Sequence, residues 1–373
     1  MTPFNAPSKN NLQPLKSKKH FIPIISLVLS AFLTSFTAQL KADDTSLDCT
    51  LGDANSCASV INLGGANNTL TQDTSLTDLY NFSPVINRNP SASANLISNK
   101  AIVKALSQIN VTQGAKFGIN FKDSVYVGNF NYSGGGYNAP ALSLIFDGSY
   151  QGDSDASLKG LSFKGDVSIF QQTLNIILKN DATWVGNSKL STEGFATPMI
   201  NLNSTDSSFQ GNINNYTASG GGGGNQHALS QTFNFSGNSS KGFALKGLDG
   251  TSNAKISTTR GTINLNLDNA AKAYADISVT TDGFSFLAMP IFNFTAKNKS
   301  ILNGGVTVGT TTINLNFDDS EFVGTLNSNG GTTNLIANNN SKLDTIKINY
   351  GSGGTTKLTL DNSTLGTAST DDG

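Results

Sequence analysis

Charged residues are scarce in this chain of 373 residues, at 13% of the sequence; tryptophan occurs once, and histidine and cysteine twice each. A disordered chain usually combines high charge with low hydrophobicity, and the 22 phenylalanines argue against that class. The 38 glycines, together with abundant Asn, Ser and Thr, are unfavourable inside helices. The composition therefore disfavours both disorder and a helical bundle, and it predicts an all-β chain.

Acidic residues are absent from the first 42 positions, which contain five lysines. An apolar stretch from Phe21 to Phe36 follows the first four lysines and is interrupted by proline, serine and threonine. It is shorter than the roughly 20 apolar residues that a membrane-spanning helix needs, and small residues follow it. We expect a secretory signal peptide over residues 1–42, cleaved near Ala42 or Ala38. An uncleaved membrane anchor is the alternative.

Removal of this segment would leave a mildly acidic chain. Subtracting its five lysines from the 24 basic residues gives 19, against 25 acidic residues, for a net charge of −6. No cluster of Lys and Arg remains, and binding to nucleic acid depends on a basic patch that neutralises phosphates. Nucleic acid is therefore not an expected partner.

The two cysteines, Cys49 and Cys57, lie shortly after the expected cleavage site. In an oxidising compartment two thiols this close can form a disulfide, and closing so short a loop contributes about 2–3 kcal/mol. Two thiols without a neighbouring histidine make a poor zinc site. We predict a Cys49–Cys57 disulfide, and no metal or other cofactor.

A repeated pattern begins near residue 116. Apolar residues alternate with Asn, Ser or Thr; Asp or Asn then comes beside Ser or Thr, and an aromatic or aliphatic residue and a glycine often close the unit. Residues 311–320 (TTINLNFDDS) and 353–363 (GGTTKLTLDNS) are two examples. Copies start near residues 117, 142, 174, 200, 233, 263, 292, 313, 333 and 358, about 27 residues apart on average, a spacing typical of repeat architectures.

The pattern predicts strands joined by turns, because alternation of period two gives each strand one apolar face and Asp, Asn, Ser and Gly favour turns. Tight Asn-Gly hairpin turns are rare, and stacked copies would align like residues in columns, with asparagines bonded along the stack. We predict a parallel β-helix over residues 116–373. Residues 43–115 would form a small capping region. A β-sandwich is the alternative fold.

Two glycine-rich insertions, Ser133–Gly136 and Ser219–Gly224, interrupt the repeat. Such stretches are exposed, and insertions in a solenoid often leave from the face that meets partners. Simple linkers would have the same composition. Both readings remain open from the sequence alone.

Residues that could support nucleophilic catalysis are few. Residues 152–155 (GDSD) resemble the serine motif of secreted trypsin-like proteases, although Asp155 stands where that family has glycine. That family places its base before the nucleophile, but His20 lies in the expected signal peptide, and His227 follows Ser154. No triad can be assembled, and a turn is the simpler role for Ser154.

Paired carboxylates offer a second chemistry, since two such groups hydrolyse glycosidic bonds. Asp318 and Asp319 are adjacent, and Asp153 and Asp155 are separated by one residue. Most acids of the chain, however, occupy the recurring turn position, which favours a structural role. We therefore expect no catalytic residue and no enzyme.

The signal peptide and units such as residues 311–320 and 353–363 resemble autotransporter passenger domains, in particular the vacuolating-cytotoxin-like (toxin-like outer membrane protein) branch. The resemblance covers residues 116–373 and the signal. It implies export, passage through a C-terminal outer-membrane β-barrel translocator, and display at the cell surface or release outside the cell.

Two features depart from that family. The last residues, Thr370 to Gly373, are not preceded by amphipathic strands of such a barrel, so we expect a fragment of a longer protein. Residues 43–115 lack the apolar, glycine-spaced segment of pore-forming members. The expected function is a non-catalytic passenger that adheres to a host-cell surface or matrix component. A pore-forming toxin subunit and a carbohydrate-active β-helix enzyme are the alternatives.

Overall fold

The computed structural model describes residues 60–371, apart from residues 64–66, 72–78, 83–84, 89–92, 101, 106–108, 112–115, 133–141, 154, 171–172, 193–197, 218–228, 282–288, 310 and 350–353. The expected signal peptide (1–42), Cys49, Cys57 and both glycine-rich insertions lie outside these residues. The predicted disulfide and cleavage site therefore stay predictions.

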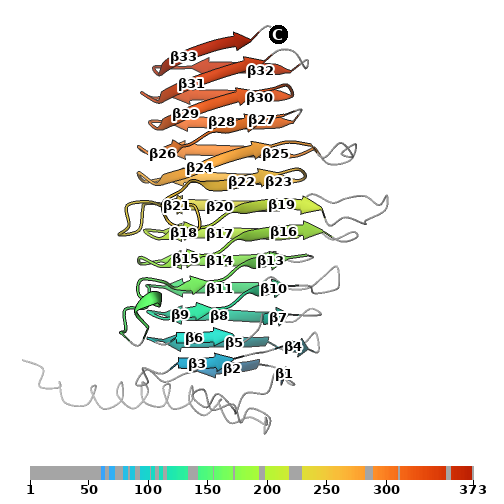
Figure 1. Ribbon diagram of the computed structural model, residues 1–373, viewed down its shortest axis with the longest axis vertical. Coiled ribbons are helices and arrows are strands. Elements are labelled where there is room, and N and C mark those ends of the chain that lie inside the picture. Colours follow the sequence, from blue (N-terminus) through green and yellow to red (C-terminus); the bar gives the residue numbers. More distant parts are fainter. Residues whose placement is uncertain are drawn as a thin grey trace, which may run out of the picture. The chain divides into compact units, whose positions relative to one another are not determined.

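The chain is a parallel β-helix, as the repeat predicts (Figure 1). Over the described residues, its strands form two sheets of 12 and 21 strands, and every strand pair there is parallel. The smaller, sheet B, contains β2 (Asn67–Thr71), β5 (Ser93–Asn99), β8 (Lys116–Lys122), β11 (Leu142–Asp147), β14 (Thr173–Lys179), β17 (Met199–Thr205), β20 (Ser230–Ser236), β23 (Thr262–Asp268), β25 (Ile291–Lys297), β28 (Thr312–Asp318), β30 (Thr332–Asn338) and β32 (Thr355–Leu360).

The larger, sheet A, contains two short strands per coil in most coils and one longer strand in others. Its members are β1 (Val60–Leu63), β3 (Leu79–Phe82), β4 (Val85–Arg88), β6 (Ile102–Ala105), β7 (Ile109–Val111), β9 (Val125–Val127), β10 (Phe130–Tyr132), β12 (Phe163–Lys164), β13 (Val167–Ile169), β15 (Thr183–Val185), β16 (Ser188–Thr192), β18 (Ser208–Gln210), β19 (Ile213–Thr217), β21 (Leu245–Lys246), β22 (Ala254–Thr258), β24 (Lys272–Val279), β26 (Ile301–Asn303), β27 (Val306–Val308), β29 (Glu321–Ser328), β31 (Lys342–Asn349) and β33 (Thr364–Asp371). A short 3-10 helix covers Ala156–Leu158.

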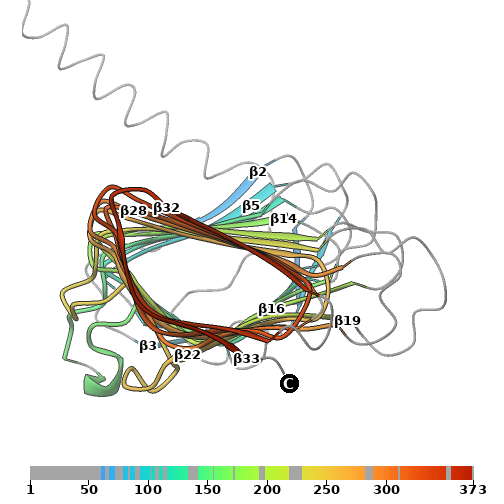
Figure 2. The ribbon, with the colours of Figure 1, turned by 90° about the horizontal axis from the view of Figure 1, so that it is seen from above.

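Each coil runs along sheet B, turns, crosses sheet A and returns, so that the two sheets face each other across the core (Figure 2). Sheet B strands from β8 onward begin within three residues of the expected repeat starts. The ladders also reach further toward the N-terminus than expected. Strands β5 and β8 pair over seven residues, and β2 pairs with β5, so the segment 43–115, expected as a capping region, already contributes coils. After β5, Lys100, with a φ of +54°, holds the turn position that Asp or Asn takes in later copies.

The core consists of side chains stacked in register. One sheet B column is Leu144, Ile176, Leu202, Phe233, Leu265, Phe294, Leu315 and Leu335, and all are at most 2% exposed. Sheet A adds Phe163, Trp184 and Phe209, whose successive ring centroids lie 5.4 and 4.2 Å apart. Burial of such columns is the main favourable term in folding.

Asparagine side chains form ladders on the outer face of sheet B, as predicted. In one ladder, each asparagine donates from its Nδ2 atom to the Oδ1 atom of the asparagine one coil earlier. The bonds run from Asn293 to Asn264, from Asn314 to Asn293 and from Asn334 to Asn314, at 2.8, 2.7 and 2.8 Å. A second ladder joins Asn266 to Asn234 and Asn234 to Asn203, both at 2.8 Å. These bonds satisfy polar groups that the stacking of coils partly removes from water.

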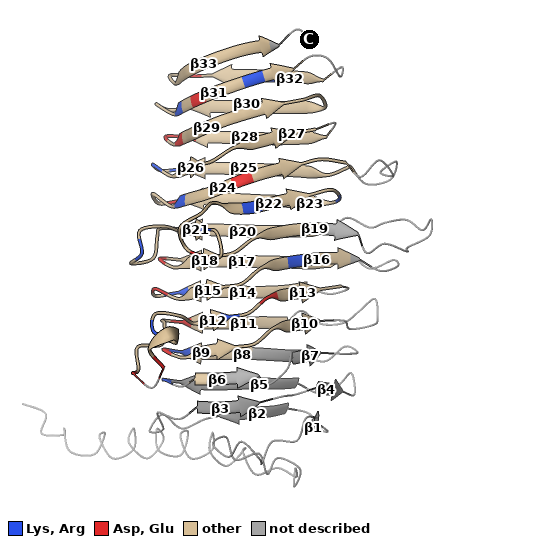
Figure 3. Cartoon of the chain, in the orientation of Figure 1, with Lys and Arg blue, Asp and Glu red and all other residues tan. Residues whose placement is uncertain are grey.

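The turns from sheet B to sheet A place Asp or Asn in the left-handed region, with φ of +47° at Asp123, +46° at Asp206 and +49° at Asp319. Among non-glycine residues, Asn and Asp tolerate this region best. The following serine closes the turn: Ser207 Oγ donates to Thr205 O at 2.8 Å. Many of the charged residues lie along this turn edge (Figure 3).

The glycine that closes the repeat bends sheet A. At Gly186, φ is +157°, and an added Cβ atom would lie 1.8 Å from the carbonyl oxygen of Gly165 one coil below. No real Cβ atom approaches a backbone oxygen this closely, so the stacking itself requires glycine. The bend turns the second strand of each coil into a new direction, and this positions the site described next.

Candidate binding groove on sheet A

A column of polar residues runs along the outer face of the second sheet A strands. Register pairing joins Asn131, Ser168, Lys189, Asn214, Ser257, Ser278, Thr307, Asn327, Lys347 and Ser369. None of them is buried. Their neighbours in each strand point into the core, because side chains alternate across a strand.

The middle of this column is hollowed into two adjoining depressions that share Asn214 and Ser257. The larger, of about 540 Å³, extends over β19, β22, β24 and β27, and its polar lining includes Lys255, Asp276 and Thr307. The smaller, of about 410 Å³, continues to Lys189 on β16. We call the two together the sheet A groove. It crosses five coils in the direction of stacking.

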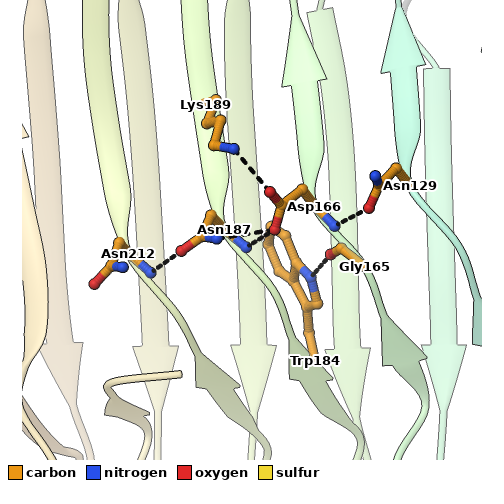
Figure 4. A network of polar contacts seen from close by, with 7 residues as sticks. All are labelled: Asn129, Gly165, Asp166, Trp184, Asn187, Lys189 and Asn212. Atoms are coloured by element: carbon orange, nitrogen blue, oxygen red, sulfur yellow. Dashed lines mark hydrogen bonds and ion pairs between the residues drawn. The ribbon is translucent and has the colours of Figure 1, made fainter. Parts of the chain in front are cut away.

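A row of polar contacts borders the groove (Figure 4). Asp166 Oδ1 accepts from the Asn187 backbone N–H at 2.8 Å and from Asn187 Nδ2 at 2.9 Å. Asn187 Oδ1 accepts from the Asn212 N–H at 3.1 Å, and Asn212 Oδ1 from the Lys255 N–H at 2.8 Å. The row ties four coils together, so the border of the groove is fixed before any ligand arrives.

Lys189 closes the end of the groove next to this row. Its Nζ lies 2.8 Å from Asp166 Oδ2. Partial burial raises the pKa of Asp166, but the Lys189 ammonium and the bonds from Asn187 outweigh it, so the pKa lies below its usual value. Asp166 is therefore ionised at neutral pH, and the two charges cancel.

Two groups in the larger depression are held in fixed orientations. Asp276 Oδ1 accepts from Asn253 Nδ2 and from the Gly305 N–H, both at 3.0 Å. Asn214 Oδ1 accepts from Ser257 Oγ at 2.7 Å. In each side chain, Oδ1 accepts a hydrogen bond from the protein, which leaves Asp276 Oδ2 as an acceptor and Asn214 Nδ2 as a donor for a ligand.

Other polar atoms of the groove have no protein partner among the described residues. They are the ammonium of Lys255 and the hydroxyl groups of Ser278 and Thr307. Lys255 is paired in register with Asp276, but no ion pair joins these two described side chains. The groove therefore presents donors and acceptors of both kinds to solvent, with little net charge.

The acids singled out from the sequence lie elsewhere. Asp153 forms an exposed ion pair with Lys159 at 3.0 Å, and Asp155 caps the 3-10 helix by accepting from Ser157. Asp319 holds its left-handed turn position, and Asp318 accepts from Asn339. Asp319 thus lies at the recurring turn position, whereas Asp153 and Asp155 lie at the loop around the 3-10 helix. Ser154 and His227 lie outside the described residues.

Within the described residues, no three His, Cys, Asp or Glu side chains gather closely enough to hold a metal ion. Over the same part of the chain, no helix has the length and apolar character needed to cross a membrane.

Sequence reasoning missed the groove. Its residues come from short strands such as Val306–Val308, and Asn214 and Ser257 are 43 residues apart. The signal available was the alternation in segments such as AKIST (254–258), where Lys255 and Ser257 share the outer face. No family model, no curated protein and no solved structure matches the chain. The fold and the groove are therefore the basis for an account of function.

Proposed function

We propose that this protein is an exported, non-catalytic binding module of the passenger type, whose β-helix presents the sheet A groove to a host-cell surface or matrix component. The observation that carries the proposal is the groove itself: a depression across five coils, lined by polar groups such as Asp276 and Asn214, which the protein orients through one atom while another atom faces solvent. Preformed sites of this kind bind with little reorganisation cost.

The placement of the acids supports a binding role over catalysis. Hydrolysis of a glycosidic bond needs two carboxylates facing one substrate, whereas Asp153, Asp155 and Asp319 are used in an ion pair, a helix cap and a turn. In the groove, Asp276 stands next to a lysine in the register. That arrangement is suited to hydrogen bonding with a ligand.

The test uses the chain from residue 43 onward, added to cultured host cells and to immobilised matrix proteins. Ser278→Tyr fills the groove, since Ser278 is exposed on β24 and lines it. Ser369→Tyr is the matched control, because Ser369 is exposed in the same column outside the groove. We expect the wild type and Ser369→Tyr to bind alike and Ser278→Tyr to bind at least about tenfold more weakly, a loss of about 1.4 kcal/mol.

Two results would contradict the proposal. If the wild type binds neither cells nor matrix, the chain is not an adhesive module. If Ser278→Tyr binds as well as Ser369→Tyr, adhesion uses another surface. Circular dichroism of both variants excludes misfolding as the cause of a loss.

A further inference from the structure

The direction of the sheet A groove suits a chain-like ligand. The residues Lys189, Asn214, Ser257, Ser278 and Thr307 follow one another in register, one per coil. Neighbouring parallel strands lie about 4.8 Å apart, so the four steps from Lys189 to Thr307 span roughly 19 Å. An extended sugar polymer has a residue repeat close to this spacing. Each coil can therefore offer its side chain to a successive sugar unit.

The charges of the groove favour a neutral ligand. Lys189 is paired with Asp166, and Lys255 stands beside Asp276 in the register. A polyanion such as a sulfated glycan would meet the two carboxylates, and a polycation would meet the two lysines. Because charges of like sign disfavour the wrong partner, the lining discriminates against both.

The free hydrogen-bonding groups match hydroxyl groups, which both donate and accept. Asp276 Oδ2 accepts, Asn214 Nδ2 and the Lys255 ammonium donate, and the Ser278 and Thr307 hydroxyls do either. The bonds from Asn253, the Gly305 N–H and Ser257 already orient the first two. Adjacent sugar hydroxyls can thus be held by a carboxylate and an amide that need not be reordered.

A peptide fits the groove less well. One recurring way of recognising an extended peptide is strand addition at a sheet edge, but the strands below the groove are paired on both sides: β22 lies between β19 and β24. Peptide interfaces also depend on anchor pockets for large apolar side chains. The polar side chains lining this groove are amides, hydroxyls and three charged groups, and its two isoleucines, Ile256 and Ile277, are at most 2% exposed.

We propose that the sheet A groove binds a neutral, hydroxyl-rich glycan in extended form, lying along the stack across β16, β19, β22, β24 and β27. The inference rests on the proposed function, of which it names the ligand class. Asp276, Asn214 and Lys255 are its principal contacts.

The test is affinity electrophoresis through gels that contain a neutral polysaccharide (hydroxyethyl cellulose, galactomannan or dextran) or heparin. We expect at least one neutral polysaccharide to retard the wild type and Ser369→Tyr, and retardation to fall at least tenfold for Ser278→Tyr. Asp276→Asn retains the Oδ1 acceptor and loses the charge, and we expect weaker binding with unchanged folding. Lys255→Ala should also weaken binding, whereas Lys347→Ala, an exposed lysine outside the groove, should not.

Failure of the ligand assignment can be told apart from failure of the binding function. If Ser278→Tyr abolishes adhesion to cells but no neutral polysaccharide retards the wild type, the groove binds and the assignment to neutral glycans is wrong. Retardation by heparin alone, weakened by salt as expected for exposed charges, overturns it too. On cells, periodate oxidation of sugar diols should remove the binding sites; loss after protease treatment only would indicate a peptide ligand and refute the inference.

Discussion

The stacked glycines that bend sheet A offer a quantitative test of the fold. In Gly186→Ala the new Cβ atom would lie 1.8 Å from Gly165 O, at a φ of +157°, so the variant combines a contact cost with a conformational cost. Forced overpacking costs about 1–3 kcal/mol, and a positive φ at a residue with a side chain about 1–2 kcal/mol. We expect Gly186→Ala to lower the free energy of unfolding by about 2–5 kcal/mol.

Two other glycines separate these costs. Gly160 has a φ of +77° and nothing within 4 Å of an added Cβ, whereas Gly211 lies outside the positive-φ region but would place its Cβ 1.6 Å from Gly186 O. Gly160→Ala should therefore lose about 1–2 kcal/mol and Gly211→Ala about 1–3 kcal/mol. Gly160→Ala and Gly211→Ala should therefore both be more stable than Gly186→Ala.

The measurement is urea denaturation followed by far-ultraviolet circular dichroism, with hydrogen exchange to locate the loss. Repeat arrays can unfold locally, because each coil contacts only its neighbours, so amides of β15 and β18 should lose protection first in Gly186→Ala. Equal midpoints for Gly186→Ala and Gly160→Ala would refute the reasoning, since the contact between coils would then cost nothing.

Three further predictions concern side-chain contacts. Asn314→Ala removes one donated and one accepted ladder bond and should cost about 1–2 kcal/mol by urea denaturation; an unchanged midpoint would mean that water replaces the ladder. Gln231→Leu removes the 2.6 Å hydrogen bonds of Gln231 with the buried side chains of Ser188 and Asn215. Although leucine would match the apolar neighbours of Gln231 in its column, Ile200 and Ile263, we expect the free energy of unfolding to fall by about 1–3 kcal/mol. A more stable variant would contradict this. The lowered pKa of Asp166 stabilises the folded state above its unfolded pKa of about 4, and this is lost as pH falls below that value toward the folded pKa. The wild type should exceed Asp166→Asn in thermal midpoint at neutral pH, and the gap should close in acid; a gap independent of pH would exclude the ionic contribution.

The sequence was sufficient to predict the strands of sheet B. Ile200, Ile263 and Ile313, which begin three copies of the pattern, are all fully buried, because seven-residue strands give a clear alternation between core and solvent. The asparagine ladders followed from the same alignment. Long strands with identical outward residues carry enough signal for both the fold and its side-chain contacts.

The sheet A strands and the groove were beyond the same reasoning. Strands of two or three residues, such as β12 (Phe163–Lys164), are too short to show a period. The register between coils depends on connections of unequal length, so Lys189, Asn214 and Ser257 align although their separations in sequence are 25 and 43 residues. The coil that contains β5 and β6 escaped detection because Lys100, and not Asp or Asn, holds the left-handed position of its turn.

The asparagine ladders of sheet B have a polarity. In each bond the later coil donates its Nδ2 to the earlier coil, as from Asn293 to Asn264, from Asn314 to Asn293 and from Asn334 to Asn314. The uppermost amide of a partly built ladder therefore always offers an open carbonyl to whatever segment arrives next. Coils can be laid down singly, in chain order, without disturbing those already in place, until Lys357, a side chain that only donates, brings the series to its end.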